Sequence, residues 1–188
     1  TIMIKTKGLI SIILIILCTA SCRNQSIIIN IDIPDQISKL FEKKIFLKIT
    51  TEFENFIYRH PNQQSLSIDI GTPQSILFKK TTKRIFSHVE TGKLSKKNTP
   101  SITIVPKLTN IEISKPEESG LSTYECRLEY SIFVKTREYA INHKILAYSR
   151  APKSNKNENQ IISELISQCM RSIASKLEIK LLELTNEI

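Results

Sequence analysis

The sequence has no tryptophan and only four glycines among its 188 residues. A glycine-rich phosphate loop needs several glycines close together, so that the backbone can wrap around a phosphate group. Carbohydrate sites built from stacked aromatic rings are also disfavoured, because aromatic residues make up only 6% of the chain. Both absences direct attention away from nucleotide and sugar binding.

Familiar catalytic motifs are also missing. The chain contains no Gly-x-Ser-x-Gly, Walker loop, His-Glu-x-x-His or Cys-x-x-Cys sequence. We interpret the isolated histidines His60, His88 and His143 as surface or capping residues in a turn, a helix end and a strand. Glu117 and Glu118 lie in a predicted hairpin loop, where adjacent carboxylates are expected to point apart into solvent. The sequence therefore predicts a protein that is not an enzyme and that uses no cofactor or metal.

Residues 1–21 have the pattern of a secretory signal peptide. Lys5 and Lys7 form a basic start, residues 8–17 are almost entirely Ile and Leu, and small residues follow before Cys22. The apolar run is shorter than the roughly 18 residues that a transmembrane helix needs. We therefore predict a cleaved signal rather than a permanent membrane span.

The end of this segment, Thr19-Ala20-Ser21-Cys22, resembles the lipobox of bacterial lipoproteins, although Thr19 stands where the family usually has Leu. The resemblance implies that Cys22 carries the lipid. Two or more acyl chains would anchor the protein stably, whereas a single chain gives only marginal membrane binding. Residues 22–26 would then form a lipidated tether. The alternative is ordinary cleavage near Ala20 or Ser21, which would release a free periplasmic protein.

The lipobox resemblance also implies a location in the cell envelope. Lipoproteins held at the inner membrane often have Asp directly after the lipidated cysteine, whereas this chain has Arg23. The resemblance therefore favours the periplasmic face of the outer membrane. The expected partners are the membrane, through Cys22, and another envelope protein, with no nucleic acid.

Residues 27–188 are predicted to form a single domain with a basic surface. Removal of Lys5 and Lys7 with the signal lowers the formal net charge from +9 to +7. Anionic lipid or glycolipid phosphates would suit this charge. The predicted anionic contact is one face of a helix, although an ordinary solvated face is the more common explanation for such a cluster. Its residues are Lys79, Lys80, Lys83 and Arg84.

Two cysteines remain after the signal and the anchor are set aside. Cys126 lies on the apolar face of a predicted strand, and Cys169 lies on the apolar face of the last predicted helix. In an exported protein such a pair is compatible with a disulfide. The alternative is two buried thiols that act as small hydrophobic side chains.

The hydrophobic patterns predict an α+β domain. Tyr124 to Val134 alternates apolar and polar residues, as a half-buried strand does. Thr72-Pro73 predicts the start of a helix that ends near Ser87, and residues 160–187 have the spacing of a long amphipathic helix. We predict a two-layer sandwich, with a mainly antiparallel sheet built on a meander of three long strands and two helices packed on one face.

This outline resembles small bacterial envelope lipoproteins of the YajG type and, more distantly, the lipopolysaccharide-assembly lipoprotein. The matching stretches include Ile68-Asp69-Ile70-Gly71, Ile104-Val105-Pro106 and Ala147-Tyr148-Ser149-Arg150. The anchor and the missing catalytic motifs favour a non-enzymatic protein that docks to another envelope component. The alternatives are an accessory role in glycolipid (lipopolysaccharide) transport or assembly, and a small-ligand carrier.

Overall fold

A computed structural model of the chain describes residues 25–33, 41–92, 100–120 and 122–186. Eight strands and four helices lie in these ranges. In chain order they are β1 (Gln25–Ile27), β2 (Phe41–Leu47), α2 (Thr51–Glu54), β3 (Ile57–His60), β4 (Gln63–Asp69), α3 (Gly71–Ile85), β5 (Phe86–Thr91), β6 (Ile102–Ser114), α4 (Pro116–Ser119), β7 (Thr123–Lys135), β8 (Ala140–Pro152) and α5 (Glu158–Asn186).

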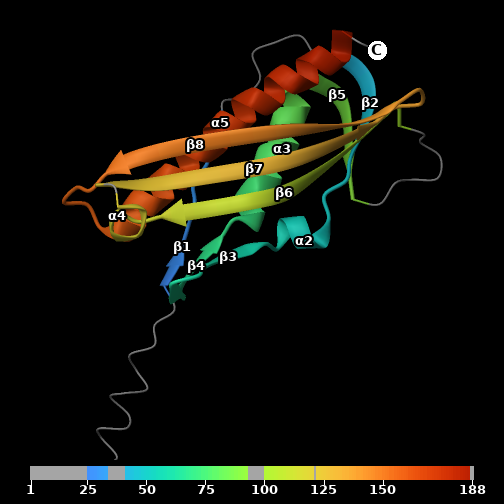
Figure 1. Cartoon of the computed structure of the whole chain (residues 1–188). Coiled ribbons are helices and arrows are strands. Elements are labelled where there is room, and N and C mark those ends of the chain that lie inside the picture. Colours follow the sequence, from blue (N-terminus) through green and yellow to red (C-terminus); the bar gives the residue numbers. More distant parts are fainter. Residues whose placement is uncertain (1–24, 34–40, 93–99, 121, 187–188) are drawn as a thin grey trace, which may run out of the picture.

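The strands form two sheets. The larger sheet has the order β5-β2-β6-β7-β8, and the smaller one has the order β1-β4-β3. In the larger sheet β2 runs parallel to both β5 and β6, whereas β6, β7 and β8 are antiparallel. Figure 1 shows the three long strands side by side, with α3 behind them. The large sheet is therefore mixed.

The predicted fold was wrong in its sheet and in its helices. The prediction had a mainly antiparallel sheet and two helices, whereas the structure has a mixed five-stranded sheet, a second sheet and four helices in the described ranges. The helix predicted to end near Ser87 ends at Ile85, and the next residues, 86–91, form β5 and pair with β2. In a segment this short, the spacing of apolar residues does not distinguish a strand from a helix. Its conformation is therefore determined by pairing with a parallel strand more than forty residues away.

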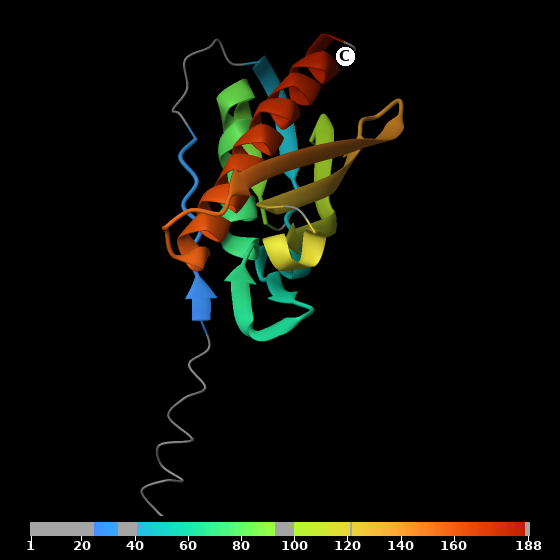
Figure 2. The same ribbon diagram turned by 60° about the vertical axis from the view of Figure 1, so that its left-hand side comes forward.

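Alternating burial positions the long strands. Along β7, Tyr124, Cys126 and Leu128 are buried, whereas the residues between them are more exposed. The buried side of this sheet faces α3 and α5, which also pack against each other. Figure 2 shows α5 crossing the β7–β8 hairpin obliquely. The opposite face of β7 and β8 carries polar and exposed apolar side chains.

Pro106 marks the point at which β2 stops pairing with β6. The Lys48 N–H donates to the Ile104 carbonyl (2.8 Å), so the polar groups of Ile104 point away from β7. Peptide directions alternate along a strand, and Pro106 therefore has its nitrogen on the same outer side. Because proline has no N–H, this position cannot donate to a further strand.

Candidate functional site

The predicted lipid anchor lies outside the described residues, as do residues 1–21. Among the helices that the structure describes, none combines the length and the hydropathy of a membrane span. Lipidation of Cys22 stays a prediction.

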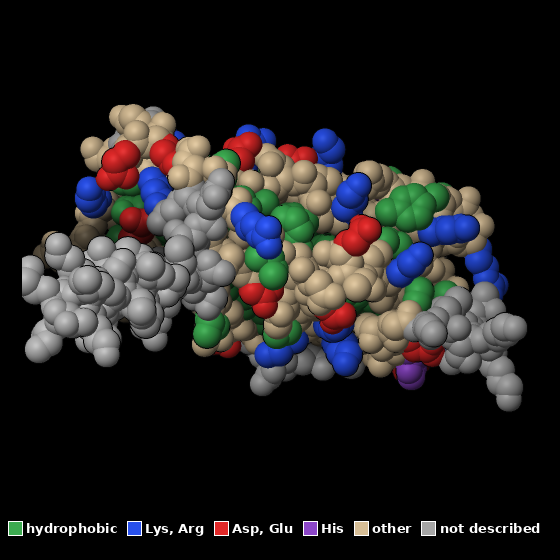
Figure 3. Space-filling model, turned by 90° about the horizontal axis from the view of Figure 1, so that it is seen from below, with side chains coloured by type: hydrophobic (Ala, Val, Ile, Leu, Met, Phe, Trp, Pro, Cys, Tyr) green, Lys and Arg blue, Asp and Glu red, His purple; other side chains and the backbone are tan. Residues whose placement is uncertain are grey.

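The predicted basic face on α3 is partly neutralised. Lys79 lies 2.9 Å from a Glu54 carboxylate oxygen, and Arg84 lies 3.4 Å from one of Glu178. Lys80 and Lys83 are exposed. On the face of the molecule seen in Figure 3, basic and acidic side chains are intermingled rather than gathered by sign. The four residues therefore form a weaker anionic contact than their sequence suggests.

The structure brings Cys126 and Cys169 together in the core. The Cys169 thiol donates to the Cys126 carbonyl at 3.2 Å and lies 3.2 Å from the Ser149 hydroxyl. Both are free thiols and fully buried, and their disulfide stays a prediction. Contact with Cys169, together with burial, raises the pKa of Cys126, so this thiol stays protonated at neutral pH.

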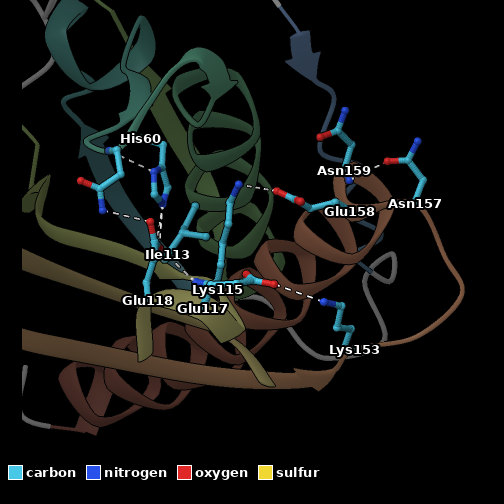
Figure 4. A network of polar contacts seen from close by, with 10 residues as sticks. His60, Ile113, Lys115, Glu117, Glu118, Lys153, Asn157, Glu158 and Asn159 are labelled. Atoms are coloured by element: carbon cyan, nitrogen blue, oxygen red, sulfur yellow. Dashed lines mark hydrogen bonds and ion pairs between the residues drawn. The ribbon is translucent and has the colours of Figure 1, made fainter. Parts of the chain in front are cut away.

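A buried histidine joins three separate segments of the chain (Figure 4). His60 is 2% exposed. Its Nδ1 accepts a hydrogen bond from the Asn62 N–H at 3.3 Å, and its Nε2 lies 3.2 Å from the Ile113 carbonyl oxygen and 3.3 Å from the Glu118 carboxylate. The accepting Nδ1 leaves the ring proton on Nε2, where it faces these two oxygens.

Glu118 is the second member of this network, which we call the α4 latch (His60, Asn62, Lys115 and Glu118). Its carboxylate accepts from the Asn62 amide at 3.0 Å and from the Lys115 backbone N–H at 3.2 Å. Desolvation opposes ionisation of Glu118, but these bonds and the nearby His60 outweigh it and lower the pKa of the carboxyl. Lys115 also pairs with Glu158 at 2.5 Å. The latch thus ties α4 to the β3–β4 hairpin and to the start of α5.

We predict that Glu118→Gln destabilises the protein in a pH-dependent way. The folded state has the lower carboxyl pKa, so its stabilisation is present at neutral pH and is lost as the pH falls through the folded-state pKa. The difference in unfolding free energy from wild type should be about 1 kcal/mol at pH 7. Denaturant titrations should show it shrinking below about pH 4.

Glu117→Gln is the matched control for this measurement, because the Glu117 carboxylate is well exposed and contacts the exposed Lys153. Its effect should be smaller at every pH. An equal loss for Glu118→Gln at pH 7 and at pH 3 would contradict the electrostatic account of the latch.

A second feature is an apolar cavity of about 320 Å³ beside the free part of β6. Phe53, Phe56 and Leu108 contribute to its lining, and Gln74 also lines it. Gln74 is fully buried, donates to the Phe53 carbonyl and accepts from the Tyr130 hydroxyl at 3.0 Å. Burial raises the pKa of Tyr130, so its hydroxyl stays a donor. The cavity could hold a small apolar group.

The third feature is the face of β7 and β8 that points away from the helices. Phe133, Leu146 and Tyr148 lie there and are 41%, 43% and 47% exposed. We call these three residues the sheet patch. A hollow of about 420 Å³ adjoins Leu146 and Tyr148, and Glu125 and Arg127 also line it. Exposed apolar side chains rimmed by charged ones are typical of protein-binding surfaces.

Metal chemistry has no support within the described ranges, where no three His, Cys, Asp or Glu side chains are grouped to hold an ion. The structure also corrects the interpretation of His60, which is buried rather than on the surface. The sequence did carry a signal for this, because His60 is two residues from the buried Tyr58 and therefore shares its strand face. Gln74 precedes Leu77 and Phe78 by one helical turn, which likewise places it on the core side.

The sequence matches no family model and no curated protein. Among solved structures, the chain is similar to protein XCC0632 from Xanthomonas campestris, a DUF330 protein, with a TM-score of 0.54 and 7% identity over 86% of this chain and 95% of that one. It also aligns with the hypothetical protein CT253 from Chlamydia trachomatis, with a TM-score of 0.38 and 8% identity over 72% of this chain and 96% of that one. The chain also aligns with a chain of a PelC dodecamer from Paraburkholderia phytofirmans, with a TM-score of 0.33 and 7% identity over 75% of this chain and 93% of that one. At such low identities the likeness to XCC0632 is one of fold alone.

Proposed function

We propose that this chain is a non-enzymatic, lipid-anchored envelope protein that docks to another envelope protein. The observation that carries the proposal is the sheet patch. Its three apolar side chains are exposed on the face that the described helices leave uncovered. Burial of such side chains against a partner is favourable at about 25 cal/mol for each Å² of apolar surface.

The lipid anchor predicted at Cys22 supports the same proposal from the sequence. A tethered domain meets membrane partners at a raised effective concentration, so a modest docking surface can suffice. The basic face of α3 offers less support for glycolipid handling, because Lys79 and Arg84 already have acidic partners.

Site-specific photo-crosslinking in cells tests this function. A photoreactive residue at Leu146 or Tyr148 should give one dominant adduct with an envelope protein. The control position is Ile57 on β3, which is 54% exposed but lies away from the sheet patch. Labelled palmitate should be incorporated by the wild type and not by Cys22→Ser, and the adduct should weaken in that variant.

Three results would count against the proposal. Equal adducts from Ile57 and from the sheet patch would show non-specific contact. A protein without palmitate label would have no anchor at Cys22. A chain that gives no protein adduct at either patch position would be better described as a small-ligand carrier.

A further inference from the structure

The outer edge of β8 has no neighbouring strand among the described residues. β8 is the last strand of the large sheet, and β7 is its neighbour on the other side. The Lys176 ammonium donates to the Leu146 carbonyl at 2.6 Å, so that carbonyl points away from β7. Peptide directions alternate along an antiparallel strand, and Lys144 and Tyr148 therefore also direct their N–H and C=O groups outward. Figure 2 shows the β7–β8 hairpin extending beyond the helices.

The same residues place side chains where an added strand would contact them. Leu146 and Tyr148 are exposed on the uncovered face, and Phe133 lies on the same face farther along β7, where it pairs with Asn142. Cross-strand apolar and aromatic neighbours each contribute roughly 0.2–1 kcal/mol to strand pairing. An incoming strand with apolar side chains on this face would therefore contact Leu146 and Tyr148 while it paired with the edge.

The charges along the edge are mostly positive. Lys144, Arg150 and Lys176 lie along it. The acidic groups that face them, Glu129 and Glu125, belong to β7 and lie 3.6 Å from Lys144 and 2.8 Å from Arg150. Lys176 contacts a carbonyl instead of a carboxylate. An added strand would need the Leu146 carbonyl, and an acidic side chain on that strand would offer Lys176 a carboxylate in exchange, which none of the described residues provides.

These charges also disfavour a second copy of the chain. Antiparallel pairing of two β8 strands about Leu146 would bring both Lys176 ammonium groups to the two-fold axis. Lysines at sheet edges commonly prevent such self-association. The edge thus discriminates between partners by charge.

We propose that the free edge of β8 accepts an extended, acidic segment of a partner protein as a sixth strand of the large sheet. The proposal deepens, and rests on, the docking function above. Backbone hydrogen bonds would supply the affinity, and Leu146 and Tyr148 together with Lys176 would supply the specificity.

Fluorescence anisotropy with two labelled peptides tests the proposal on the full-length protein in detergent. One peptide alternates valine and glutamate, and the other alternates valine and lysine. The glutamate peptide should bind and the lysine peptide should bind at least about tenfold more weakly. Lys176→Glu should reduce this preference. Thermal melts of each variant would show that the fold is retained.

Tyr148→Pro and Tyr148→Thr form the decisive pair of variants. Both remove the aromatic ring, but only proline removes the outward N–H, and proline is tolerated at sheet edges. Tyr148→Pro should bind the glutamate peptide about tenfold more weakly than Tyr148→Thr. Equal affinities would overturn strand addition, and equal binding of the two peptides by the wild type would overturn the charge argument.

Sedimentation of the wild type tests whether a second copy of the chain occupies the edge. A dimer that Tyr148→Pro dissociates, with no peptide binding, would make a second copy the occupant and overturn the proposal. The result is also separable from the envelope function. A cellular adduct at Leu146 without peptide binding would support docking and contradict strand addition. Peptide binding without a cellular adduct would support strand addition at β8 and contradict docking to an envelope protein.

Discussion

Replacing Phe78 with alanine is expected to lower the free energy of unfolding by about 3–5 kcal/mol. The Phe78 ring is fully buried between two other rings. Its centroid lies 5.5 Å from that of Phe53 in an edge-on arrangement and 5.4 Å from that of Tyr130. These rings come from α2, α3 and β7, so the substitution would leave a cavity where three elements meet.

Phe133→Ala is the matched control for this cavity, because the same atoms are deleted from a ring that is 41% exposed. Its cost should stay within about 0.5 kcal/mol, as for most surface substitutions. Urea denaturation of both variants measures the difference. A loss below about 1 kcal/mol for Phe78→Ala would show that the core closes around the missing ring.

Gly71→Ala is the second change with a large expected effect, about 3 kcal/mol, at the upper end of the usual cost of overpacking. Gly71 is buried at the first position of α3, and its N–H donates to the Phe56 carbonyl at 2.8 Å. A Cβ atom there would overlap the Glu54 carbonyl oxygen and would lie 2.5 Å from the Phe56 nitrogen. Both neighbours are backbone atoms, so α3 would have to move away from α2 and from the segment that joins α2 to β3.

The adjacent Thr72→Ala tests whether helix α3 is sensitive to any substitution at its start. Thr72 is exposed, and its backbone N–H donates to the Asp69 carboxylate. Alanine would keep this hydrogen bond, because it has the same backbone N–H. Thermal unfolding should therefore show a much smaller shift for Thr72→Ala than for Gly71→Ala. Similar melting temperatures for Gly71→Ala and wild type would mean that the helix start accommodates a methyl group.

These two sites also bear on the docking proposals. Phe78 lies in the core and Gly71 lies at the start of α3. The sheet patch lies on the opposite face of the sheet from the helices. Variants of Leu146 or Tyr148 should therefore change partner binding while the protein keeps most of its stability. This separation makes the binding experiments interpretable, because a lost contact can be distinguished from a lost fold.

Local patterns predicted individual elements well where one period was sustained. The alternation from Tyr124 to Val134 matches the alternating burial along β7, and the spacing of Ile162, Leu165 and Cys169 matches the buried side of α5. A strand repeats every two residues and a helix every 3.6, so side chains in such a run reveal which face is buried. The signal-like pattern of residues 1–21 is local in the same sense.

Contacts between distant segments were decided by the tertiary structure. The parallel pairing of β2 with β5, the burial of His60 beside Glu118, and the contact between Gln74 and Tyr130 each join residues more than forty positions apart. The apolar faces of Cys126 and Cys169 could be predicted, but their meeting required α5 to cross β7. The sequence by itself determined which face of each long element is buried, because that depends on neighbours within one turn or one pleat. Only the tertiary structure decided which buried faces meet and which strand edges stay free, because these depend on how the elements pack together.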